Sequence, residues 1–156
     1  MTSLDTSHLD VDDRREHTDA VVDRALELLL AHDMTGFAHL WAPTGTMDFP
    51  FAGPGQPARL DGRAAIVDYL AGYTDLLDVR AIASQTRYHT VDPETVIVEF
   101  EVEGLAVASQ SPYVMRYIAV IMVGADGITS YRDYWSPLAA VAALGSTASI
   151  GQERSR

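Results

Sequence analysis

The second half of the sequence alternates apolar and polar residues with a period of two. The pattern covers residues 79–91, 95–108, 113–123 and 128–136. Three turn signals separate these segments: Asp92-Pro93-Glu94, Gln110-Ser111-Pro112 and Asp126-Gly127. This arrangement predicts four long strands joined by short turns, paired antiparallel in chain order. A sheet of this kind has one apolar face that other elements must cover.

The first half of the chain has helical patterns instead. Residues 16–32 carry an apolar stripe, and a short helix is expected after Asp33 or Thr35, ending at Pro43. A strand over 45–48 and a loop over 49–60 follow, and Asp61 is expected to cap a third helix over 62–77. Helices followed by a meander of strands predict an α+β fold with the helices on one sheet face.

Composition limits the domain count and the possible partners. With 156 residues the chain is expected to form one domain over 16–145, between a disordered arm (1–15) and a flexible tail (146–156). The net charge of −11 argues against nucleic acid or an anionic membrane as partner. There is no cysteine, no secretory signal and no long apolar run, so a cytoplasmic protein is expected.

Asp133 stands between two large aromatic residues on the last predicted strand. Because side chains alternate faces along a strand, Thr129, Tyr131, Asp133 and Trp135 are expected to share one side. A carboxylate buried among aromatic rings has a raised pKa and can exchange protons near neutral pH. The alternative is an ion pair with Arg132 or Arg116, or a carboxylate that faces solvent.

The element order and the segment 126–145 resemble the nuclear-transport-factor-2-like superfamily. Within it, the sequence is most similar to the SnoaL-like polyketide cyclases and their phenazine-biosynthesis relatives. The segments Arg24-Ala25-Leu26-Glu27-Leu28, Gly45-Thr46-Met47-Asp48 and Leu60-Asp61-Gly62-Arg63 also fit. The resemblance implies a cone-shaped, curved antiparallel sheet wrapped around the N-terminal helices, with an apolar cavity. It also implies a homodimer formed through the outer sheet face.

The same resemblance implies a function for Asp133. In the cyclases an acidic residue at this position is the general acid/base. The expected activity is therefore a cyclase or isomerase reaction on a hydrophobic polycyclic or polyketide-like intermediate of secondary metabolism, such as antibiotic biosynthesis. One alternative is an epoxide hydrolase or epoxide-opening cyclase with a nucleophile activated by Asp133. Another is a non-catalytic ligand-binding or accessory dimeric protein.

Further site residues are hypotheses beside Asp133. Asp48 is a candidate second acid/base or else a turn residue, and His89 could shuttle protons with Asp133 or simply pack. Arg116 could hold an enolate oxygen, or pair with Glu99 or Glu101 across the sheet. The candidate pocket-lining residues are Trp41, Phe49, Tyr69, Tyr117, Tyr131 and Trp135. The five histidines lack a ligand spacing and no phosphate-binding loop is present, so neither metal nor cofactor is implied.

Overall fold

The computed structural model describes residues 7–144, and the side chains from residue 10 onward. Its helices are α1 (Ser7–Leu30), α2 (Met34–Ala38), α3 (Arg63–Leu70), α4 (Tyr73–Leu76) and α5 (Pro137–Leu144). Its strands are β1 (Trp41–Asp48), β2 (Arg59–Asp61), β3 (Leu77–His89), β4 (Thr95–Ala106), β5 (Ser111–Gly124) and β6 (Gly127–Trp135). The predicted tail, 146–156, lies outside the described residues.

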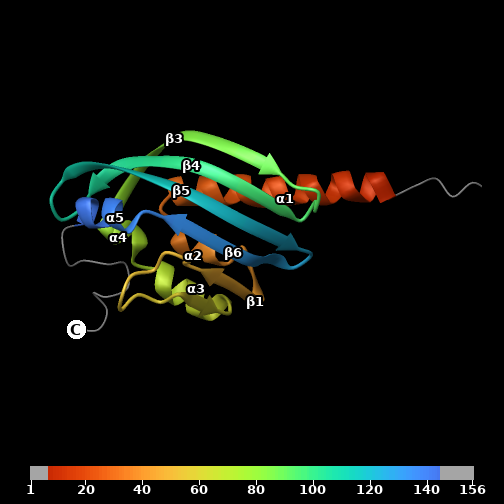
Figure 1. Ribbon diagram of the computed structural model, residues 1–156, viewed down its shortest axis with the longest axis horizontal. Coiled ribbons are helices and arrows are strands. Elements are labelled where there is room, and N and C mark those ends of the chain that lie inside the picture. Colours follow the sequence, from red (N-terminus) through yellow and green to blue (C-terminus); the bar gives the residue numbers. More distant parts are fainter. Residues whose placement is uncertain (1–6, 145–156) are drawn as a thin grey trace, which may run out of the picture.

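The six strands form one sheet in the order β2-β1-β6-β5-β4-β3. Strands β3 to β6 pair antiparallel in chain order, which confirms the predicted meander. β1 extends the sheet by pairing in parallel with β6, and β2 closes that edge. Figure 1 shows the four long strands as curved ribbons with α1 alongside them, and α4 and α5 at one end of the sheet. The α+β class is confirmed.

The inner face of the sheet forms the core together with the helices. On β4, Val96, Val98, Phe100 and Val102 are buried, whereas the intervening glutamates point to the outer face. The apolar stripe of α1 belongs to the same buried cluster as these residues. Burial of this apolar surface is the main favourable contribution to folding. No helix within residues 7–144 is long and apolar enough to cross a membrane.

The prediction of a disordered arm is wrong for residues 7–15, because α1 begins at Ser7. Contacts with the β3–β4 turn hold this part of the helix. Arg14 forms an ion pair with Glu94 at 2.8 Å, and the Thr18 hydroxyl donates to the Pro93 carbonyl at 2.9 Å. The charged residues that suggested disorder therefore include groups that anchor the helix. Residues 1–6 lie outside the described part.

Local boundaries differ from the predictions at several glycine and proline positions. Asp33 caps α2 as expected, accepting from the Gly36 amide at 2.8 Å. Pro43 lies inside β1 and does not end a helix. The predicted third helix is divided at Gly72 into α3 and α4, and Gly62 occupies the N-cap position expected for Asp61.

A β-bulge in β6 changes one face assignment. Ser130 pairs with Met122 and Ile128 pairs with Val123, so Thr129 is an extra residue between them. Ile128 and Tyr131 are both buried while Thr129 is exposed, and the prediction that Thr129 shares a face with Tyr131 is wrong. Before the bulge, Gly127 has a φ of 122°, the left-handed conformation expected of a glycine in this turn.

Candidate active site

Asp133 places one oxygen of its carboxyl group in the interior of the fold. It extends from β6, where Asp133 pairs in register with the buried Ala119 of β5. Part of the residue is accessible, but its Oδ1 is buried and has no hydrogen-bond partner among the described residues. Burial raises the pKa of Asp133 to about 7, since the charged form loses its hydration. Both protonation states are therefore populated near neutral pH.

Two small cavities border on Asp133. Their volumes are about 40 and 50 Å³, and both are lined by Met47, Leu70, Tyr73, Tyr117 and Asp133. A water molecule needs about 10–15 Å³ of such space, so the two cavities together suit a guest of roughly one small ring. Ala140 and Leu144 of α5 form part of the first cavity's wall. A larger guest would need α5 to move.

The cavity walls are apolar and aromatic apart from Asp133. Within the part of the chain that the structure describes, no lysine, arginine or histidine lines either cavity. Burial raises the pKa of Tyr69 to about 12 and that of Tyr73 above its usual range, with the nearby Asp133 charge adding to both effects. These phenols therefore remain protonated at neutral pH and act as hydrogen-bond donors. The site combines one titrating carboxyl group with neutral hydroxyl donors in an otherwise apolar space.

A tyrosine that sequence reasoning did not select contributes to this site. Tyr73 of α4 places its hydroxyl 2.8 Å from the hydroxyl of Tyr117 on β5, and both residues are buried. The available signal was its position on the apolar stripe with Ile66 and Leu70. The stripe indicated burial, but only the fold shows that the hydroxyl reaches a cavity.

Most of the predicted aromatic residues gather around Asp133. Phe49, Tyr69, Tyr117 and Trp135 line the first cavity, and Tyr131 lines the second. Trp41 does not line either one. It is fully buried between Phe37 and Tyr131, with ring centroids 5.6 and 5.3 Å away, and its indole N–H donates to the Thr46 carbonyl. Trp41 is a core residue.

Asp48 does not reach the cavities. It ends β1, next to the edge strand β2, where it pairs in register with Arg59. Its Oδ1 lies 3.4 Å from the Arg59 Nε, which forms an ion pair at the surface. The hypothesis that Asp48 acts with Asp133 is therefore wrong, because the pairing of β1 with β2 directs it elsewhere.

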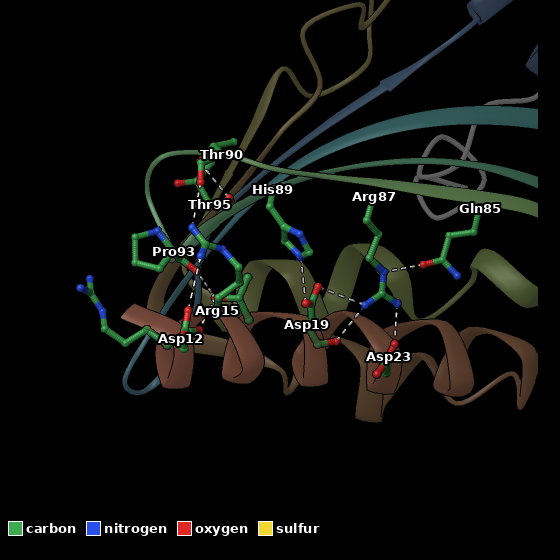
Figure 2. A network of polar contacts seen from close by, with 12 residues as sticks. Asp12, Arg15, Asp19, Asp23, Gln85, Arg87, His89, Thr90, Pro93 and Thr95 are labelled. Carbon is green, nitrogen blue, oxygen red and sulfur yellow. Dashed lines mark hydrogen bonds and ion pairs between the residues drawn. The ribbon is translucent and has the colours of Figure 1, made fainter. Parts of the chain in front are cut away.

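His89 and Arg116 also lie away from Asp133. His89 ends β3, and its Nε2 is 2.8 Å from Oδ2 of Asp19 on α1, within the polar cluster of Figure 2. Arg116 is on the outer sheet face, with 84% of its side chain exposed, and donates to Glu101 at 3.0 Å. The strand register directs Tyr117 inward and Arg116 outward, and neither His89 nor Arg116 lines the cavities that Asp133 lines.

A third hollow, of about 680 Å³, lies on the outer face of the sheet. It is open to solvent and its lining includes Glu101, Arg116, Ile118 and Tyr134. Asp133 does not line it. Among the side chains of residues 10–144, no group of three His, Asp or Glu residues is placed to hold a metal ion.

Comparison with known proteins identifies the family of the chain. The model of the SnoaL-like domain matches residues 22–140. The uncharacterised protein YesE of Bacillus subtilis is 37% identical over 75% of this chain and 80% of its own length. An uncharacterised PhzA/B-like protein of Pseudomonas aeruginosa is 35% identical over 80% of this chain and 88% of its own length.

A solved structure of similar length supports membership of the same family. A Bacillus subtilis protein with the provisional name isomerase superposes with a TM-score of 0.82 and is 33% identical. The match covers 86% of this chain and 96% of that protein. The chain belongs to the SnoaL-like family and has the nuclear-transport-factor-2-like fold.

Proposed function

We propose that the protein is an acid/base enzyme in which Asp133 moves a proton at a carbon atom of a hydrophobic carbonyl compound. The reaction is an isomerisation or ring closure. The observation that carries this proposal is the buried, unpaired Oδ1 of Asp133 inside an aromatic cavity. A structural carboxylate would have an ion-pair or hydrogen-bond partner there, since leaving it unpaired costs stability.

The raised pKa of Asp133 suits both directions of proton transfer. General acid/base catalysis is most effective when the pKa of the group lies near the working pH. At pH 7 the ionised form takes a proton from carbon, and the protonated form returns it to another position. The apolar wall around the buried Oδ1 limits hydration of the carboxylate, which keeps the group basic.

The size of the cavities limits the substrate. The family resemblance suggests polycyclic or polyketide-like intermediates of secondary metabolism, whereas the present space holds about one small ring. A single-ring carbonyl compound fits without rearrangement. A polycyclic compound requires displacement of α5, whose Ala140 and Leu144 form part of the wall.

Hydrogen–deuterium exchange at carbon tests the proposal without a known substrate. The protein is incubated in heavy water with enolisable ketones graded by size, from cyclohexanone through tetralone to a tricyclic ketone, and exchange is followed by NMR. We expect catalysed exchange that rises as the pH passes through about 7, because the ionised carboxylate is the base. The Asp133→Asn variant should lose about 10²–10⁴-fold in rate.

Asp48→Asn is the matched control, because it removes a carboxylate that lies outside the cavities. It should exchange at the wild-type rate. Equal rates in the wild type and the Asp133→Asn variant, or no catalysed exchange with any ketone of the series, would contradict the proposed function.

A binding protein for a small organic cation is the second candidate. The unpaired charge of Asp133 and the surrounding aromatic rings favour an ammonium guest, which both would attract. Calorimetric titration with trimethylammonium and tetramethylammonium salts tests it. Epoxide opening is less favoured because it needs an acid that protonates the epoxide oxygen besides the base that activates the nucleophile. The inward side chains of β4, from Val96 to Val102, are apolar, and among the described residues Asp133 is the one acid that lines the cavities.

We further propose that the protein forms a homodimer through the outer face of the sheet. Val114, Ile118 and Met122 expose apolar side chains along the outer side of β5, with exposed fractions of 51, 45 and 39%. Arg116 and Glu101 stand beside them and give this surface both charge signs. A second copy related by a two-fold axis would cover the apolar row and match the charges.

A further inference from the structure

The hydroxyl groups of Tyr73 and Tyr117 form a pair beside Asp133. Their oxygens are 2.8 Å apart, both residues are buried, and both line each of the cavities that Asp133 lines. The pair is built from two elements that are distant in sequence, α4 and β5. It is therefore held in place by the fold and not by a flexible segment.

The pair has one more proton than its protein surroundings use. Two hydroxyl groups carry two protons, and one of them forms the bond between the oxygens. The other has a single possible acceptor in the described residues, the Met115 sulfur, 3.8 Å from the Tyr117 oxygen. A thioether is a weak acceptor. Whichever tyrosine donates to the other, a strong donor remains available to an oxygen atom in the cavity.

Both hydroxyls stay protonated under ordinary conditions. Burial raises the pKa of Tyr73 and of Tyr117 well above the value of a free phenol, and the charge of Asp133 acts in the same direction. The pair is therefore a neutral donor and not a base. This complements Asp133, which is the group that accepts a proton.

We propose that the Tyr73–Tyr117 pair binds the carbonyl oxygen of a small, uncharged, enolisable substrate and stabilises the enolate that forms from it. The inference rests on the proposed function. The C–H bond next to the carbonyl breaks, its proton goes to Asp133, and its electron pair moves toward the carbonyl oxygen. The spare hydroxyl proton is donated to that oxygen as its charge develops. Reprotonation of the same or a conjugated carbon from Asp133 completes the cycle.

Binding of 4-fluorophenol to the Asp133→Asn variant tests this role directly. The phenolate imitates an enolate, and the asparagine stands for the protonated acid that exists at that stage. Fluorine NMR and ultraviolet absorbance give the ionised fraction of the bound probe across pH. We expect the pKa of the bound phenol to fall by at least one unit, which is a tenfold preference for the phenolate.

Removing either hydroxyl should abolish that preference. Asp133→Asn combined with Tyr73→Phe or with Tyr117→Phe should lose it at least tenfold. Tyr113→Phe in the same background is the matched control. The Tyr113 hydroxyl on β5 is buried and has no hydrogen-bond partner among the described residues, but Tyr113 does not line the cavities. Its effect on the bound phenol should be within twofold. Using both tyrosine variants keeps the test valid if one fails to fold.

Three results would overturn the inference: no binding of 4-fluorophenol, binding without a change in its pKa, or an unchanged phenolate fraction in both tyrosine variants. The exchange assay separates this failure from failure of the proposed function. Exchange that depends on Asp133 but not on the tyrosines would support the acid/base role of Asp133 and contradict the role of the tyrosine pair. Phenolate binding without any exchange supports the oxyanion site and contradicts the acid/base role.

Discussion

Asp133 and Asp19 are chemically identical groups in opposite surroundings. Asp19 of α1 accepts from His89 at 2.8 Å and from Arg87 at 3.3 Å, and Figure 2 shows both side chains reaching it from β3. Asp133 has a buried Oδ1 with no partner among the described residues. The first carboxylate joins a helix to a sheet, whereas the second costs stability where it stands. This difference is the basis of the proposal that Asp133 acts on a bound molecule, whereas Asp19 holds α1 against β3.

The largest expected effect on stability comes from removing the unpaired charge. The pKa of Asp133 is about 7 in the folded protein and about 3.9 when unfolded. The unfolded chain therefore loses its proton first, so the free energy of unfolding of the wild type falls between about pH 4 and pH 7 and then levels off. Asp133→Asn removes this decrease in the free energy of unfolding, because asparagine does not ionise.

Urea unfolding of both proteins at pH 5 and pH 8 checks the sign. The advantage of Asp133→Asn over the wild type should increase by roughly 2–3 kcal/mol between these pH values. Asp19→Asn is the contrasting variant and should be less stable than the wild type, because Arg87 loses an ion-pair partner. An Asp133→Asn advantage that does not change with pH would show that Asp133 is ionised normally.

The next effect concerns the paired region. Arg87 has only 18% of its side chain exposed and contacts Asp19, Asp23 and Gln85. Arg87→Met should lower the free energy of unfolding by about 1–3 kcal/mol, since it removes the partly buried guanidinium that donates to the half-buried Asp19 and to the exposed Asp23 and Gln85. Chemical denaturation measures it.

Arg80→Met is the matched control on the same strand. Arg80 is 60% exposed and pairs with Asp78 at 3.0 Å, so its removal should change stability by less than about 0.5 kcal/mol. If both variants were equally stable, the ion pairs of Arg87 with Asp19 and Asp23 would contribute no more to stability than an exposed surface ion pair. The statement that Asp19 and its partners stabilise the fold, in contrast to Asp133, would then be contradicted.

Sequence patterns predicted the parts of the fold that depend on local periodicity. The alternation of Val96 to Val102 placed β4 with the correct face inward, and the aromatic neighbours of Asp133 drew attention to it. The same patterns failed where long-range packing decides. Residues 7–15 looked too polar to fold, but contacts of Arg14 with the distant β3–β4 turn hold them in a helix.

Site geometry was predictable only in part, for the same physical reason. The alternation of side chains between the two faces of a strand identified Tyr131 and Trp135 as residues that share a face with Asp133. Asp48 and His89 were grouped with it by residue type, but pairing with Arg59 and Asp19 directs them elsewhere. The alternation also failed at Thr129, where the bulge inserts an extra residue. Tyr73 could not be selected, because its partner Tyr117 is 44 residues away.

The smallest expected effect on the stability of the single chain lies on the outer face. Ile118→Arg replaces a side chain that is 45% exposed, so the free energy of unfolding should change by less than about 0.5 kcal/mol in a monomer. In the proposed dimer the same change buries a charge beside its own copy and should halve the molecular mass in analytical ultracentrifugation. Arg80→Met, on β3, should keep the wild-type mass. A wild type that sediments as a monomer would contradict the dimer, and the outer face would then be a solvated surface whose ion pairs, like Arg116–Glu101, contribute little.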